Sequence, residues 1–219
     1  MTSADDSPPT HLRRAILTDL TPVRPLRPPV HRALALLPLA LLLVLAQPMV
    51  FGVRRDAVVL GPAFLWGLSL GQSLLGLLLL VAALREAVPG RAMPFSQGLL
   101  GLGAVAGLVV TFVTWSNSMT RVPSGRFVFL WEVCFTGPML LGLPLVFVTL
   151  WMALRAYPLR PALVGALAGL GVGLLTDAGW RTFCHVSDPR HVLTAHGAAL
   201  AALCGLGALF GAALWRRRG

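Results

Sequence analysis

Six apolar runs separated by short polar connections constrain this chain more than any other feature. The runs cover residues 30–51, 62–84, 95–115, 129–152, 161–180 and 192–215. As helices rising about 1.5 Å per residue, they are long enough to cross the roughly 30 Å hydrocarbon core of a membrane. Because lipid offers no hydrogen-bond partners to an open backbone, such runs must be helical there. The sequence therefore predicts an all-α integral membrane protein, with a six-helix transmembrane bundle over residues 30–219.

Composition and charge agree with a membrane protein and exclude a nucleic-acid-binding module. Hydrophobic residues make up 56% of the 219 residues, and charged residues only 12%, about half the charged fraction of an average soluble domain. The net charge of +10 would suggest nucleic acid as a partner if the protein were soluble. Here the arginines flank the apolar runs, and no basic patch is interleaved with aromatic residues as nucleic-acid binding requires.

The distribution of the arginines predicts the orientation of the bundle. Twelve of the 18 basic residues fall in or beside the N-terminal tail, the second and fourth connections and the C-terminus, and six fall in the other connections. Connections rich in arginine stay on the cytoplasmic side of a membrane. Both termini are therefore predicted to be cytoplasmic, and residues 1–29 form a cytoplasmic N-terminal tail.

The tail contains one segment with helical periodicity, residues 11–20. Leu12, Ile16 and Leu20 recur every four residues on one face, and arginines take the other. Pro22 ends this short amphipathic helix because proline lacks an amide hydrogen, and the proline-rich stretch after it is predicted to be an extended spacer. The apolar stripe would either enter a groove on a partner protein or anchor the helix to membrane lipid.

Small residues recur at four-residue spacing within several runs. This spacing lets two helix backbones approach closely in lipid, where apolar burial alone gives no drive for association. Packing within one bundle and homodimerisation both use such stripes. The pairs and triplets are Gly67/Gly71, Gly103/Gly107, Gly165/Gly169/Gly173 and Gly207/Gly211.

Polar groups that could support transport or catalysis within the membrane are scarce. Glu132 and Asp177 fall toward the outer ends of their runs, and Gln72 and His196 are the main uncharged polar side chains inside the runs. Polar residues at mid-membrane are costly and mark ion or substrate pathways. The sequence contains no nucleophilic triad, phosphate-binding loop or metalloprotease motif. The protein is therefore not expected to be an enzyme, and a small transporter or channel is the alternative function.

Two of the three cysteines are predicted to lie at a similar depth on the outer, oxidising side. Cys134 follows the start of the fourth run and Cys184 follows the fifth, whereas Cys204 is in the middle of the sixth, where a thiol usually fills space. The outer pair has three interpretations: inert thiols, a disulfide or redox pair, or ligands of a soft or borderline metal ion. For the metal, His185 is the nearest additional ligand, and His191 and His196 follow it.

Seven short motifs, spread over nearly the whole chain after residue 10, carry a family resemblance. They are DLTPVRPL at 19–26, WEVC at 131–134, PL at 144–145, LR at 154–155, RPAL at 160–163, GALAG at 165–169 and FCHVSDP at 183–189, with His196 beyond them. Together they resemble the NrsF family of six-span membrane anti-sigma factors. Members of that family negatively regulate a sigma factor of the extracytoplasmic-function class in proteobacteria.

The resemblance implies a place and a partner for this chain. It would be a multi-pass protein of the bacterial inner membrane whose cytoplasmic tail binds a sigma factor. Cys134 and Cys184 would sense stress such as heavy metals. If they bind a transient heavy-metal ion, His185 is the nearest further ligand by its position in the sequence. The residues that the resemblance and the amphipathic pattern assign to sigma binding are Leu12, Ile16, Asp19, Leu20, Pro22, Val23 and Pro25.

Overall fold

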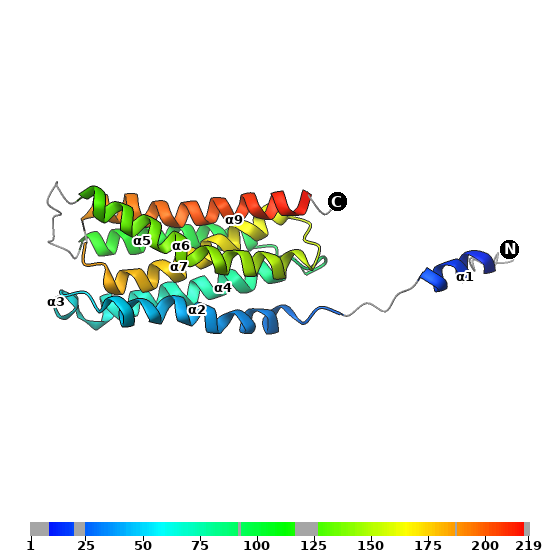
Figure 1. The fold of residues 1–219 in the computed structure, drawn as a ribbon, viewed down its shortest axis with the longest axis horizontal. Helices are drawn as coiled ribbons and strands as arrows, with labels where there is room; N and C mark the ends of the chain where they lie inside the picture. Colours follow the sequence, from blue (N-terminus) through cyan, green and yellow to red (C-terminus); the bar gives the residue numbers. More distant parts are fainter. Residues whose placement is uncertain (1–8, 20–24, 92, 117–126, 187, 217–219) are drawn as a thin grey trace.

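The computed structural model describes residues 9–19, 25–91, 93–116, 127–186 and 188–216, and within these ranges all regular elements are helices (Figure 1). The predicted all-α fold is therefore confirmed. The longer helices are α1 (Thr10–Asp19), α2 (Pro29–Phe51), α4 (Leu68–Glu86), α5 (Ser96–Ser116), α6 (Phe127–Leu154), α7 (Pro161–Phe183) and α9 (Ala198–Arg216). The short elements are α3 (Ala57–Pro62), α8 (Pro189–His191) and two π-helical turns, η1 (Ala63–Gly67) before α4 and η3 (Val192–Gly197) before α9.

Five helical segments of the described chain are long and apolar enough to cross a membrane. They are Pro29–Phe51, Ala63–Glu86, Leu130–Leu154, Pro161–Phe183 and Pro189–Arg216, and they match five of the six predicted runs to within a few residues. The remaining run corresponds to α5. Its apolar part, Ser96–Val110, is shorter than these five segments. The count of six spans stays a prediction.

Helix α7 is the centre of the bundle. Every residue from Val164 to Thr182 is buried, and α2, α4, α5, α6 and α9 all pack against it. Figure 1 shows the long helices running along the long axis of the molecule. The start of α2 and the end of α9 lie at one end, and α3 and the connection between α7 and α8 lie at the other. We call these the terminal end and the cysteine end.

Glycines bring the backbones of α7 and α9 into direct contact. A Cβ atom on Gly165 would overlap the carbonyl oxygen of Gly207, and one on Gly169 would overlap that of Leu203. Such stripes pack helices within this chain, as the four-residue spacing allowed. A Cβ atom on Gly67 or Gly71 would meet no heavy atom within 4 Å, so that pair makes no close backbone approach to another described helix.

Two buried charged side chains join helices at the terminal end. In the first turn of α2, Arg32 donates to the carbonyl oxygens of Met152 at 2.9 Å and Leu84 at 3.0 Å, near the C-termini of α6 and α4. A cation suits the negative end of a helix dipole. Glu86 forms an ion pair with Arg160 and accepts a hydrogen bond of 2.5 Å from the Ser96 hydroxyl. The beginnings of α2, α5 and α7 are thereby fixed to the ends of α4 and α6.

The N-terminal helix α1 lies apart from the bundle in Figure 1. Leu12 and Ile16 are 48% and 52% exposed, so their apolar stripe contacts little of this chain. Leu20, Pro22 and Val23 lie outside the described residues. The cytoplasmic location of α1 stays a prediction.

Candidate functional site

Cys134 and Cys184 lie side by side at the cysteine end. Cys134 is on α6, and Cys184 ends α7, where its amide donates to the Trp180 carbonyl at 2.8 Å. The two side chains are buried, and their sulfur atoms are 3.6 Å apart. The structure therefore brings together the two cysteines that the sequence placed at similar depth.

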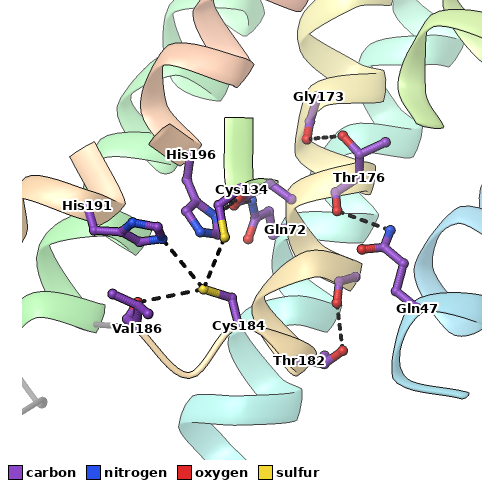
Figure 2. A network of polar contacts seen from close by, with 12 residues as sticks. Gln47, Gln72, Cys134, Gly173, Thr176, Thr182, Cys184, Val186, His191 and His196 are labelled. Carbon is purple, nitrogen blue, oxygen red and sulfur yellow. Dashed lines mark hydrogen bonds and ion pairs between the residues drawn. The ribbon is translucent and has the colours of Figure 1, made fainter. Parts of the chain in front are cut away.

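Two histidines complete a compact group with the cysteines (Figure 2). The Cys184 sulfur is 3.7 Å from Nε2 of His191, and the rings of His191 and His196 are 5.5 Å apart. One ligand atom from each of Cys134, Cys184, His191 and His196 lies within 4.8 Å of the other three, and all four residues are buried. We call these four residues the Cys₂His₂ cluster.

The π-helical turn η3 explains how both histidines reach the cluster. In a regular α-helix, residues five apart point about 140° away from each other around the axis. A π-helix bonds residue i to residue i+5, so residues five apart come onto the same side. His191 precedes η3 and His196 lies within it. The turn before it begins with Pro189, and the Asp188 side chain accepts a hydrogen bond of 2.9 Å from the Arg190 amide.

A chain of hydrogen bonds orients His196. Its Nδ1 atom lies 2.6 Å from a carboxylate oxygen of Asp177 on α7, and the other oxygen accepts a 2.5 Å hydrogen bond from Gln72 on α4. With Nδ1 protonated toward Asp177, the lone pair of the ring is on Nε2. That nitrogen is buried without a hydrogen-bonding nitrogen or oxygen partner among the described residues, and Figure 2 shows His196 facing the sulfur atoms.

Apolar and cationic side chains surround the cluster. Trp180 packs on α6 at Gly137, one turn beyond Cys134, and Val186 and Ala195 bury the cysteines further. Arg54 and Arg181 line a small cavity beside Asp177, Cys184 and His196. Burial disfavours the charged thiolate, whereas nearby guanidinium groups or a bound cation favour it.

Ionisable groups just outside the spans are also perturbed. The Cys134 thiol, as the nearest hydrogen-bond partner, and then burial raise the pKa of Cys184 well above its usual value. A hydrogen bond from Arg54, with N–O distances of 2.6 and 2.7 Å, is the main cause of the lowered pKa of Asp56. The Arg54 amide donates to the Thr182 carbonyl at 2.9 Å, so this ion pair is fixed to the end of α7.

The remaining residues predicted for the site lie elsewhere. His185 is exposed and is not part of the cluster, although it directly follows Cys184. Cys204 is half-buried on α9 and packs with the main apolar core. In the tail, Pro25 lines a shallow pocket with Leu26, Arg27, Arg32, Trp151, Met152 and Arg155, whereas Asp19 ends α1 and its side chain is not described.

The sequence placed His191 and His196 after His185 as further possible ligands, but it gave no reason to connect His196 with Asp177 and Gln72. Helical periodicity of 3.6 residues places His191 and His196 on different faces, so the π turn was needed to pair them. Asp177 and Gln72 are on different spans, and only packing brings them together. The feature of the sequence that could have indicated these residues is their polarity, because a polar side chain within or beside an apolar run is costly.

The fold and the cluster together define a class of protein: the described chain is helical, has several helices long and apolar enough to span a membrane, and carries a buried thiol–imidazole group at one end. Residues 17–216 match the model of the NrsF family, described as negative regulator of sigma F. The chain belongs to this family, and its partner is accordingly a sigma factor. No curated protein and no solved structure matches the chain.

Proposed function

We propose that this protein is an anti-sigma factor of the bacterial inner membrane. It sequesters a sigma factor of the extracytoplasmic-function class through residues 1–29 on the cytoplasmic side. It releases that factor when Cys134 and Cys184 respond to a metal or an oxidant on the opposite side. A bound sigma factor cannot join RNA polymerase, so the protein acts by binding and carries out no chemical reaction.

Family membership over residues 17–216 is the observation that carries this proposal. The geometry supports a separation between partner binding by the tail and sensing by the cysteines. Helix α1 presents Leu12 and Ile16 outside the bundle, as a helix that fills a groove on a partner would. Cys184 directly follows the end of α7, and Cys134 lies beside it, at the end of the bundle away from the start of α2. Signal and partner would therefore act on opposite sides of the membrane.

A signal at the cysteines must change the affinity of the tail for the sigma factor, or it has no effect. Helix α7 connects the two ends, because it carries Asp177 beside the cluster and begins at Pro161, next to the Arg160–Glu86 ion pair. A small shift of α7 along α9 and α4 would therefore also move the start of α7 at the terminal end. There, Arg32 joins the first turn of α2 to the ends of α4 and α6.

A transporter would need a polar path along the bundle. The central helix α7 instead packs against α9 with its backbone in direct contact at Gly165 and Gly169. This packing leaves no space between these two helices for a hydrated path. No specific observation favours transport over sigma binding.

Binding of the tail tests the proposal directly. A peptide of residues 1–29 is expected to bind the cognate sigma factor without the bundle, as measured by isothermal titration calorimetry. Leu12→Asp, Ile16→Asp and Leu20→Asp together should abolish binding, because losing one apolar anchor at an interface costs about 2 kcal/mol or more, roughly a 30-fold loss of affinity. In cells, the triple variant should release sigma activity.

The control adds the same kind of charge to the other face of α1. His11→Asp and Thr18→Asp should leave binding within a few-fold of the unchanged peptide, since both side chains lie away from the Leu12 stripe. If the triple variant still represses at normal abundance, the helix does not bind sigma. Binding of the peptide to lipid vesicles but not to sigma would favour a membrane anchor instead.

A further inference from the structure

We infer that the Cys₂His₂ cluster is a closed, four-ligand site for a resident divalent d¹⁰ cation of the Zn²⁺ class, with Cys134, Cys184, His191 and His196 as ligands. This inference rests on the proposed function only for its regulatory consequence. It assigns the two histidines as metal ligands, and it means that the thiols bind a metal ion in the resting state. His185 has no part in it.

The distances within the cluster fit tetrahedral coordination. Zn–S bonds of about 2.3 Å and Zn–N bonds of about 2.0–2.1 Å place two sulfurs about 3.8 Å apart, and a sulfur and a nitrogen about 3.6 Å apart. The observed separations are 3.6 Å between the sulfurs and 3.7 Å from Cys184 to His191. A disulfide needs about 2.05 Å between the sulfurs. The widest pair of ligand atoms is within 4.8 Å, so a contraction of about 1 Å closes the site.

The geometry at His196 points to a cation. Nδ1 lies 2.6 Å from a carboxylate oxygen of Asp177, so a neutral ring that donates from Nδ1 has its lone pair on Nε2, on the side of the sulfur atoms. Histidines that bind metals usually donate their other nitrogen to a carboxylate in this way, because the carboxylate fixes the ring and raises its basicity. Gln72 in turn orients Asp177. Among the described residues, Nε2 has no nitrogen or oxygen hydrogen-bond partner, and a buried ring nitrogen is costly unless a sulfur atom or a ligand satisfies it.

The donor set selects the type of ion. Two thiolates and two imidazoles in a tetrahedron favour Zn²⁺ over hard cations such as Mg²⁺, which prefer oxygen ligands. All four ligands are buried, so no open position remains for substrate, which is typical of structural zinc sites. Two thiolates neutralise the divalent charge, which suits a site packed against Trp180 and Val186.

The ion would join α6, the end of α7 and the turn leading into α9. Cys134 is on α6, Cys184 ends α7, and the histidines flank and occupy η3. A more thiophilic cation such as Cd²⁺ would displace Zn²⁺ by ligand exchange, with larger bond lengths in the same cage. In the anti-sigma factor, this metal exchange at the two thiols would be the sensing step that precedes release of the sigma factor.

Co²⁺ titration of the full-length protein tests the site, with Co²⁺ as the coloured substitute for Zn²⁺. In detergent and without oxygen, the protein is expected to bind one Co²⁺ per chain, with sulfur-to-metal charge-transfer absorption and the intense d–d bands of a tetrahedral site. Zn²⁺ should displace it and bleach the spectrum. Folded wild-type protein that shows no such bands overturns the inference, and so does an ion-free Cys134–Cys184 disulfide in protein isolated without oxidant.

Variants identify the ligands. Cys134→Ser, Cys184→Ser, His191→Ala and His196→Ala should each abolish the tetrahedral spectrum. His185→Ala and Cys204→Ser, the matched controls, should leave spectrum and affinity unchanged; a loss in His185→Ala that exceeds the loss in His191→Ala overturns the assignment. Gel filtration and far-ultraviolet circular dichroism verify that each variant is folded, and the wild-type titration decides the question even if some are not.

Asp177 is a positioning residue in this site. Asp177→Asn should keep the tetrahedral spectrum while lowering the affinity for Co²⁺ about 10- to 100-fold, as losses of such outer partners do. A purely structural role would change stability but not this affinity. The titration uses no sigma factor, so it tests the metal site separately from the proposed function. Metal binding can be absent while the tail peptide still binds sigma, and metal can bind while the peptide does not.

Discussion

At the scale of single residues, the cysteine pair gains its properties from its neighbours. A thiol in an apolar shell is normally inert. Cys134 and Cys184 differ from Cys204 because they face each other and two imidazoles, with Arg54 and Arg181 beside them. Cys204, half-buried against the main core, has only packing to contribute.

The two cysteines are expected to act as a single unit. Cys134→Ser, Cys184→Ser and the double variant should have the same phenotype, since residues that share one site show strong coupling rather than additive effects. Each should make sigma output unresponsive to metal or oxidant. A sigma-dependent reporter in cells measures this response.

Cys204→Ser is the control for that experiment and should keep full induction. Retention of full induction by both single variants would contradict the sensor role of the pair. A loss of induction in Cys204→Ser alone would place the sensor on α9 instead.

At the scale of elements, the contacts of α7 determine how the bundle assembles. Its glycines allow the backbones of α7 and α9 to touch, and similar approaches occur at Gly76 on α4 and Gly171 on α7. Side chains at such positions would separate the helices and weaken the dispersion contacts that hold helices together in lipid. The same contacts fix the position of Asp177 relative to η3.

Gly207→Ala is expected to destabilise the bundle, because its Cβ would overlap the carbonyl oxygen of Gly165. Overpacking of this kind typically costs about 1–3 kcal/mol. Gly205→Ala, on the same helix, is the matched control: a Cβ there meets nothing within 4 Å. Thermal unfolding in detergent, followed by tryptophan fluorescence, should show a lower Tm for Gly207→Ala alone. Equal Tm values would mean that α7 and α9 are less closely packed than described.

At the scale of the whole molecule, the prediction concerns topology. Six spans with both termini in the cytoplasm follow from the split of 12 and six arginines. Reporter fusions after Arg91, Ala156 and Gly219 should behave as cytoplasmic, and fusions after Ser124 and Ser187 as periplasmic. A periplasmic fusion at Gly219 would require an odd number of spans or a periplasmic N-terminus, and either would overturn this topology.

The sequence alone determined the helical fold and the approximate bounds of the helices. Lipid forces apolar runs to satisfy their own backbone hydrogen bonds, so length and hydrophobicity suffice. The start of α7 at Pro161 and the end of α2 at Phe51 were predicted to the residue. The proximity of Cys134 and Cys184 could be anticipated for the same reason, since depth in the membrane follows from position in a run.

Only the tertiary structure decided which helix is central, which glycine stripes pack, and which imidazoles join the thiols. Helical periodicity cannot anticipate η3, because a π turn depends on the packing around it rather than on local propensity. Gln72, Asp177 and His196 come from three separate helical segments, and no local pattern relates them. Exposed His185 adjoins Cys184 in sequence, yet buried His191 and His196 reach the sulfurs, because the chain turns back into the bundle after Pro189.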